Sequence, residues 1–244
     1  MTPFIKDVQS AVRKLNAILA KGWNSRYSIH SDVGAGGDKT AGIDSLAEAI
    51  YVDSLSKFGQ IDSEESGTIG TSCGTKIIID PIDGSDNVIS GLPYFGSSIA
   101  LERDGKVEEA VVVNLANGDF FYKTDKSLMA GKVDNDRFEP VIKREDSLIG
   151  VFEKAYAHPK VVNTLLKEKL KFRSPGAVAL SLAYAHYVDF VLFVGPRRRY
   201  DFAAALWLCE DLEIIKEDEL LIVSKSCNIA YKLQDLLLEQ KDNK

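Results

Sequence analysis

Carboxylate side chains are concentrated in one part of this 244-residue sequence. Residues 32–86 hold eleven Asp and Glu against three Lys, a local net charge of −8 in a chain whose total is −6. Two like unit charges about 4 Å apart repel by roughly 4 kcal/mol at an effective dielectric constant near 20, so clustered carboxylates must protonate, spread apart or bind cations. All-oxygen ligation suits Mg²⁺ or Mn²⁺. The segment therefore predicts a divalent-cation site wherever these side chains meet.

Two of the carboxylates stand three residues apart. Asp80 ends the apolar run KIIID (76–80), which predicts a buried strand, and PIDGS (81–85) has the composition of a turn. Asp83 precedes two small residues whose backbone N–H groups are suited to anion binding. The glycine falls at the fifth position of DPIDGS, which excludes an EF-hand loop, and one residue too many separates the aspartates for a haloacid dehalogenase motif.

Composition excludes several other classes of protein. The sequence pI near 5.2 argues against binding to nucleic acid or to an anionic membrane surface, and no apolar run reaches about 18 residues. The three cysteines form no CxxC pair, and the three histidines do not stand at zinc-ligand spacing. We therefore expect a cytoplasmic protein without disulfides, with no nucleic-acid partner and no membrane segment.

The elements that must position the carboxylates change in character along the chain. The first half predicts helices over 5–19 and 43–58, separated by a glycine-rich loop, and then strands over 95–102, 107–115 and 119–123. Asn117-Gly118 predicts a hairpin between the last two strands. From about residue 145, strands and helices alternate: 148–154, 158–170, 174–188, 189–194, 200–212, 220–224 and 228–240. This pattern predicts helices layered on sheets, in two packed subdomains, 1–135 and 136–244.

Three motifs together resemble those of the inositol monophosphatase superfamily. They are SEESG (63–67), DPIDGSDNVISGLPYFGSSIAL (80–101) and RRYDFAAALWL (198–208), in the order and at the spacing that the superfamily shows. The superfamily includes inositol monophosphatases, archaeal-type fructose-1,6-bisphosphatases and phosphoadenosine phosphatases. The resemblance implies an αβαβα sandwich, commonly a homodimer, and lithium-sensitive, Mg²⁺-dependent hydrolysis of phosphomonoesters.

The resemblance also implies roles for individual residues. The implied metal ligands, for two or three Mg²⁺ ions or for Mn²⁺, are Glu64, Asp80, the carbonyl oxygen of Ile82, Asp83 and Asp201. Glu64 and Ser85 would orient the attacking water, with Asp44 supporting Ser85 from behind. The implied substrate-binding residues are Asp83, Gly84, Ser85, Gly176, Ala177 and Asp201. For Glu65 the sequence leaves open whether it supports the site or is simply solvated.

The chain departs from the superfamily at positions that concern the substrate. Val194 stands where inositol phosphatases place an acidic residue, which weakens an inositol-specific interpretation. Arginines occupy 197–199, and because guanidinium groups suit a second phosphate, Arg197 or Arg199 is predicted to face the substrate. Adjacent side chains in an extended loop point in opposite directions, so the three cannot all face one site.

The motifs predict a phosphoric monoester hydrolase acting on a small phosphorylated metabolite, either inositol 1-phosphate or a sugar bisphosphate such as fructose-1,6-bisphosphate. Two alternatives stay open. One is a 3'-phosphoadenosine 5'-phosphate phosphatase, and the other is a non-catalytic regulator that keeps the fold and binds a partner protein.

Overall fold

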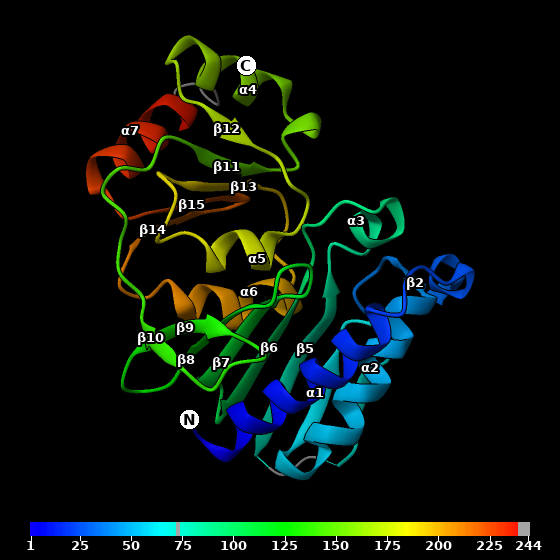
Figure 1. Ribbon diagram of the computed structural model, residues 1–244. Coiled ribbons are helices and arrows are strands. Elements are labelled where there is room, and N and C mark those ends of the chain that lie inside the picture. The colour runs from blue at the N-terminus through cyan, green and yellow to red at the C-terminus, as the bar shows by residue number, and fades with distance from the viewer. Residues whose placement is uncertain (72–73, 239–244) are drawn as a thin grey trace.

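The protein is built of five alternating layers of helices and sheets (Figure 1). The computed structural model describes residues 1–71 and 74–238. Helices α1 (Pro3–Leu19) and α2 (Gly42–Leu55) cover one face of an eight-stranded sheet, and α5 (Val178–Ala183) and α6 (Arg199–Leu208) lie between that sheet and a five-stranded one. Helices α4 (Pro159–Lys167) and α7 (Cys227–Leu238) pack on the outer face of the second sheet. This order confirms the predicted αβαβα sandwich.

Helix α1 shows how the sequence pattern produces the first layer. The hydroxyl of Thr2 caps the helix by accepting from Ile5 N, and Pro3 opens the first turn, where a missing N–H is tolerated. The predicted apolar positions Ile5, Val8 and Leu15 are fully buried against the sheet. Each such side chain contributes roughly 1.5–3 kcal/mol to folding.

The large sheet has the strand order β10-β9-β8-β7-β6-β5-β3-β4, with only β3 and β5 parallel among its pairs. Its strands are β3 (Gln60–Ser63), β4 (Gly67–Ile69), β5 (Thr75–Asp83), β6 (Gly96–Arg103), β7 (Lys106–Asn114), β8 (Asp119–Lys123), β9 (Leu128–Lys132) and β10 (Phe138–Pro140). The hairpin predicted at Asn117-Gly118 joins β7 to β8, with Gly118 at φ 79°.

Strand β5 differs from its prediction because it continues through Pro81 to Asp83 instead of turning after Asp80. Its register with β6 shifts between Asp80 and Asp83. Such an irregularity accommodates a proline, which has no N–H for the ladder. The chain leaves the strand at Gly84, whose φ of 91° is left-handed, and enters the short helix α3 (Ser85–Ser90).

The second sheet has the order β12-β11-β13-β15-β14. Its strands are β11 (Gly150–Glu153), β12 (Phe172–Arg173), β13 (Val191–Val194), β14 (Glu213–Glu217) and β15 (Leu220–Ser224). The helix predicted over 174–188 is shorter than expected: α5 covers only Val178–Ala183, because Ala177 is still extended and the chain after Ala183 forms turns. The last predicted helix is confirmed as α7, and residues 239–240 lie outside the described range.

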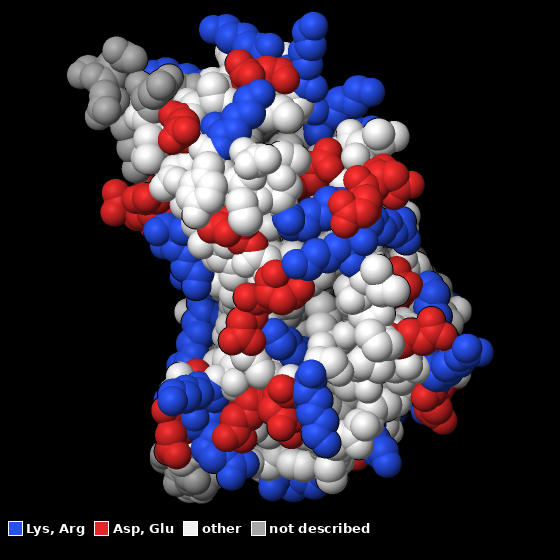
Figure 2. All heavy atoms as spheres, turned by 90° about the vertical axis from the view of Figure 1, so that its left-hand side faces the viewer, with Lys and Arg blue, Asp and Glu red and all other residues white. Residues whose placement is uncertain are grey.

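The surface of the face in Figure 2 carries acidic and basic side chains in alternation.

Of the cysteines, Cys209 is buried and Cys227 exposed, each as a free thiol, while Cys73 lies outside the described residues. Over residues 1–71 and 74–238, no helix combines the length and the apolar character needed to cross a membrane.

Candidate metal centre

The parallel pairing of β3 and β5 brings the first two carboxylates together. Ser63 is paired with Ile79, and the N–H of Glu64 donates to the Ile79 carbonyl at 3.0 Å. Glu64 therefore emerges from the end of β3 directly beside Asp80 on β5. Both side chains are buried.

The third carboxylate arrives from a segment more than 100 residues further along the chain. Asp201 lies in the first turn of α6, and Ser98, the register partner of Asp80 on β6, donates its hydroxyl to the Tyr200 carbonyl at 3.3 Å. Ligand oxygens of Glu64, Asp80 and Asp201 all lie within 4.8 Å of one another, and all three residues are buried. We call these three residues the acidic cluster.

Asp83 lies near the acidic cluster but points to a different partner. Its Oδ2 accepts from the N–H of Leu180 in α5 at 2.8 Å. Burial raises the pKa of Asp83 well above its ordinary value, and the neighbouring Asp201 charge raises it further. Ile82, whose carbonyl the resemblance implies as a ligand, is a buried residue of β5 between Asp80 and Asp83 in sequence, on the same irregular stretch of strand.

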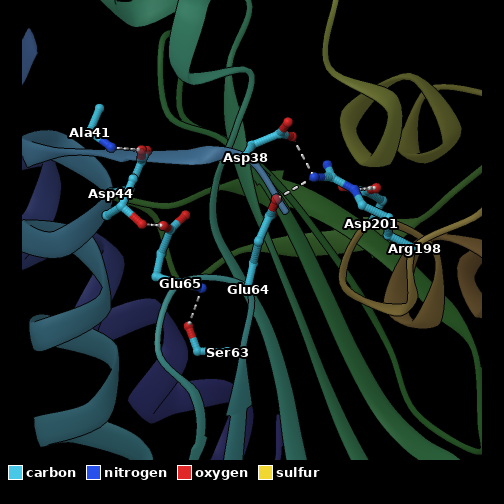
Figure 3. A network of polar contacts seen from close by, with 9 residues as sticks. Asp38, Ala41, Asp44, Ser63, Glu64, Glu65, Arg198 and Asp201 are labelled. Atoms are coloured by element: carbon cyan, nitrogen blue, oxygen red, sulfur yellow. Dashed lines mark hydrogen bonds and ion pairs between the residues drawn. The ribbon is translucent and has the colours of Figure 1, made fainter. Parts of the chain in front are cut away.

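Asp44 sits behind the cluster at the start of α2. Its Oδ2 accepts from Ala41 N at 2.8 Å, and within the described part of the chain its buried Oδ1 has no hydrogen-bond partner. Burial raises the pKa of Asp44 to about 7, against a lowering by the Ala41 hydrogen bond, and the charges of Glu65 and Glu64 raise it further. Glu65 faces the same region and accepts from the Thr40 hydroxyl, so it belongs to the polar network around the site (Figure 3).

The glycine-rich loop lies directly on the Glu64–Glu65 segment. It connects β1 (His30–Val33) to β2 (Lys39–Ala41), and the N–H of Gly36 donates to the Glu64 carbonyl at 2.7 Å. A Cβ atom at Gly36 would lie 2.4 Å from Glu64 Cγ, closer than any side chain allows. The approach of this loop therefore requires glycine.

Arg198 reaches into the acidic cluster from the residue that precedes α6. Its Nε and Nη2 donate to the two oxygens of Asp201 at 2.9 and 3.0 Å, and its Nη1 donates to Glu64 at 2.5 Å and to Asp38 at 2.6 Å (Figure 3). Asp38, on the glycine-rich loop, is 81% exposed, whereas Asp201 is 5% exposed. One guanidinium group thus joins two cluster carboxylates to the loop.

The two arginines predicted to face the substrate are engaged elsewhere. Arg197 donates to the backbone carbonyls of Glu217 and Leu220, next to the turn between β14 and β15. Arg199 pairs with Asp62 at 3.3 Å and with Glu102 at 2.7 Å. The middle arginine of the run enters the site instead, in keeping with the expectation that the three cannot all point one way.

The predicted substrate residues form a second group next to Asp83. A Cβ atom at Gly84 would lie 3.1 Å from Ala177 Cβ and 3.2 Å from the Gly176 carbonyl oxygen, so the start of α3 and the start of α5 are in contact. Ser85 is the first, half-buried residue of α3. The structure therefore brings Gly84, Ser85, Gly176 and Ala177 together.

Glu153, which the sequence did not single out, fixes the start of α5. It is 1% exposed at the end of β11, and it accepts from Gly176 N at 2.9 Å, from Ala177 N and from the Ser181 hydroxyl. Burial raises the pKa of Glu153, and these hydrogen bonds oppose the rise. The N–H groups of Gly176 and Ala177 thus have an internal acceptor, and the substrate-binding role of these two residues stays a prediction.

The electrostatics of the acidic cluster suit a cation. Burial raises the pKa of Glu64 to about 7 even though Arg198 lowers it, and burial together with Glu64 and Asp83 raises the pKa of Asp80 well above its ordinary value. Desolvated carboxylates with raised pKa values bind either protons or cations. Three carboxylate ligands and the orphaned Oδ1 of Asp44 behind them fit a hard divalent ion.

A cavity of about 1240 Å³ lies apart from the acidic cluster. It opens beside β8, β9 and the turns after α5, and its lining includes Tyr94, Asp119, Lys132, Arg144 and Tyr184. None of the residues predicted as metal ligands lines it. The acidic cluster and this cavity are therefore separate features of the molecule.

Arg198 and Glu153 are the functional residues that sequence reasoning missed. For Arg198 a signal was present, because it stands three residues before Asp201, the spacing of neighbours on a helix. For Glu153 there was none, since its partners lie 23 and 28 residues away and depend on how β11 meets α5.

Comparison with known proteins matches residues 1–212 to the inositol monophosphatase family. The Nus factor SuhB of Escherichia coli (strain K12) is 30% identical over 231 residues, 89% of this chain and 86% of that protein. Fructose-1,6-bisphosphatase of Pyrococcus furiosus is 28% identical over 210 residues, 82% of this chain and 77% of that protein.

Solved structures share the fold over nearly the whole chain. The extragenic suppressor protein suhB from Bartonella henselae gives a TM-score of 0.78 at 24% identity and covers 97% of this chain and 98% of its own. A solved inositol monophosphatase-fructose 1,6 bisphosphatase gives a TM-score of 0.79 at 21% identity, covering 98% and 99%. At these identities the likeness shows the fold alone.

Proposed function

Because this chain belongs to the inositol monophosphatase family, we propose that it is a Mg²⁺-dependent phosphatase of small phosphorylated metabolites. The observation that carries the proposal is the convergence of three buried carboxylates, from β3, β5 and α6, on one point. The acidic cluster sets three carboxylates against the one guanidinium group of Arg198, and burying carboxylate charge that stays uncompensated is unfavourable by several kcal/mol per ion, so such an arrangement serves a cation better than it serves the fold.

The residues that would hold the ions are Glu64, Asp80, Asp83, Asp201 and the Ile82 carbonyl, with Mn²⁺ as a possible substitute. A divalent ion bound there would supply Lewis-acid chemistry toward water and phosphoryl oxygens. The hydrogen bond from the Leu180 N–H ties the side chain of Asp83 to α5. Asp83 would have to bind the ion while keeping this hydrogen bond, or exchange the hydrogen bond for the ion.

The remaining steps fall to groups of the chain itself. Glu64, at the end of β3, and the Ser85 hydroxyl, at the start of α3, would together orient the attacking water. The backbone of Gly84 and Ser85 would bind the phosphate. The glycine-rich loop supports Glu64 from behind, because the N–H of Gly36 donates to the Glu64 carbonyl, and Asp44 would support Ser85.

For the substrate, we propose the sugar bisphosphate and inositol 1-phosphate classes. The named fructose-1,6-bisphosphatase relative supports the first class. Val194 in place of an acidic residue is a reason to rank inositol 1-phosphate second. A homodimer, a cytoplasmic location and lithium sensitivity remain predictions from the sequence.

A panel of phosphomonoesters tests the proposed function. Purified protein is incubated with fructose-1,6-bisphosphate, inositol 1-phosphate or 3'-phosphoadenosine 5'-phosphate, with Mg²⁺ or with EDTA, and released phosphate is measured. We expect release from one of the first two substrates, only with Mg²⁺. Preference for the nucleotide would assign the protein to the phosphoadenosine phosphatases, and no release from any substrate would contradict a catalytic function.

The second candidate function is binding of a partner protein without catalysis. It is favoured by the similarity to SuhB of Escherichia coli, which is named as a Nus factor. That name describes the relative. Retained metal binding without phosphate release from the panel would support it.

A further inference from the structure

The guanidinium group of Arg198 contacts carboxylate oxygens of two of the three members of the acidic cluster. It forms a two-pronged contact with both oxygens of Asp201, at 2.9 and 3.0 Å, and a third contact with Glu64 at 2.5 Å. Two-pronged arginine–carboxylate pairs are among the strongest polar contacts in proteins. Two of the three carboxylates in the acidic cluster thus already share one positive charge that the chain itself supplies.

We propose that Arg198 is an internal counter-ion that competes with the divalent cation for Glu64 and Asp201. The inference rests on the proposed function, since it assumes that the acidic cluster is a metal centre. A guanidinium group held this close would place a positive charge beside the ion, and two like charges at such short range repel strongly in a partly buried site. Metal binding therefore requires Arg198 to release the carboxylates.

The structure provides a place for the released side chain. Nη1 of Arg198 also contacts Asp38, which lies on the glycine-rich loop and is 81% exposed. Asp38 is not a member of the acidic cluster, so this contact can persist when the other two are lost. Arg198 is itself 30% exposed and lies at the residue before α6, where the backbone is extended, so its side chain can turn outward without unwinding the helix.

The competition sets the metal concentration that the protein needs. Without metal, Arg198 compensates the buried charge of Glu64 and Asp201 and stabilises the fold. When metal binds, displacing Arg198 costs free energy, and this cost lowers the apparent affinity of the protein for the ion. Replacing Arg198 should therefore weaken the metal-free protein and tighten metal binding, two effects of opposite sign from one substitution.

The test is a calorimetric titration of Mn²⁺ and Mg²⁺ into the full-length chain, with melting temperatures measured in EDTA and in excess metal. Arg198→Gln keeps a polar side chain but removes the charge and the two-pronged contact. We expect it to bind metal about tenfold more tightly than the natural protein or better. Its melting temperature should fall in EDTA, and the rise on adding metal should be larger than in the natural protein.

Arg199→Gln is the matched control because it removes the same charge one residue away, from a side chain paired with Asp62 and Glu102. Its metal affinity should stay within about twofold of the natural value. Arg198→Lys keeps the charge without the fork and should fall between the natural protein and Arg198→Gln, which also covers the case that the glutamine variant does not fold without metal.

The outcomes separate the inference from the proposed function. Equal or weaker metal binding by Arg198→Gln, with normal binding by the natural protein, would overturn the competition and leave the metal centre standing. Equal tightening by Arg199→Gln would also overturn it, because general charge would then explain the effect. Absence of metal binding in all four proteins would contradict the proposed function itself.

Discussion

Asp80→Asn is expected to abolish metal-dependent phosphate release while raising the stability of the metal-free protein. Asparagine has nearly the same shape but offers no negative charge, so the acidic cluster loses one of its three carboxylate ligands. Loss of one preorganised electrostatic group at such a centre lowers kcat by about 10²–10³-fold or more. Phosphate release with the best substrate of the panel, at saturating Mg²⁺, measures the effect.

The gain in stability follows from the environment of Asp80. The residue is 2% exposed, and its ionised form is opposed first by burial and then by Glu64 and Asp83. Removing the charge removes that repulsion, so we expect the free energy of unfolding to rise by about 1 kcal/mol or more at pH 8 in EDTA. A variant that is merely misfolded would lose both activity and stability. Lost activity together with raised stability therefore distinguishes a metal ligand from a residue that only supports the fold.

Asp53→Asn is the matched control for this substitution. Asp53 is an 80% exposed residue of α2 that pairs with Lys14 at 3.8 Å, and it is not one of the predicted ligands. The same change in net charge there should leave activity within about twofold and stability within about 0.5 kcal/mol. Phosphate release by Asp80→Asn above about a tenth of the natural rate would contradict the ligand role.

The stability of the metal-free protein is expected to fall as the pH rises from about 4 to about 7. The folded-state pKa is raised to about 7 for Asp44 and Glu64, from ordinary values of 3.8 and 4.5. Between those values the folded chain binds protons that the unfolded chain has released, so raising the pH favours unfolding. Two groups shifted by this much should change the free energy of unfolding by on the order of a few kcal/mol.

Bound metal should reverse the trend. Carboxylates must lose their protons to bind a cation, so the stabilisation by Mg²⁺ grows with pH as Glu64 and its neighbours ionise. Urea unfolding at pH 5 and pH 8, in EDTA and in excess Mg²⁺, measures both trends. A metal-free protein that is more stable at pH 8 than at pH 5 would show that the acidic cluster is ionised and satisfied without metal.

Much of the fold followed from local pattern. The apolar spacing of α1 and the Asn117-Gly118 hairpin each depend on neighbours in sequence, and each is confirmed. The helix predicted over 43–58 is shorter than expected, because α2 ends at Leu55 and a 3-10 turn over Ser56–Phe58 leads to Gly59. The pattern also predicted helices layered on sheets, because elements with one apolar face have few ways to pack, whereas the αβαβα layer order was implied by the family resemblance. Strand β5 runs further than predicted. Pro81 was interpreted as part of a turn, but it lies within the strand, at an irregular position of the pairing with β6.

The candidate site was only partly predictable. The members of the acidic cluster were named from motifs, yet their convergence depends on the parallel register of Ser63 with Ile79 and on the hydrogen bond from Ser98 to Tyr200, which pattern does not specify. The arginine run showed the same limit. Its composition indicated that one side chain would turn inward, but only the fold decides which, and it selects Arg198 over its two neighbours.

The most direct test of the account is a crystal structure of the protein soaked with Mn²⁺, in which anomalous scattering locates the ion. We predict an ion coordinated by carboxylate oxygens of Glu64, Asp80 and Asp201 at about 2.0–2.3 Å, with Arg198 no longer contacting Asp201. An ion bound elsewhere, or an acidic cluster that holds Arg198 and no ion at saturating Mn²⁺, would contradict the account.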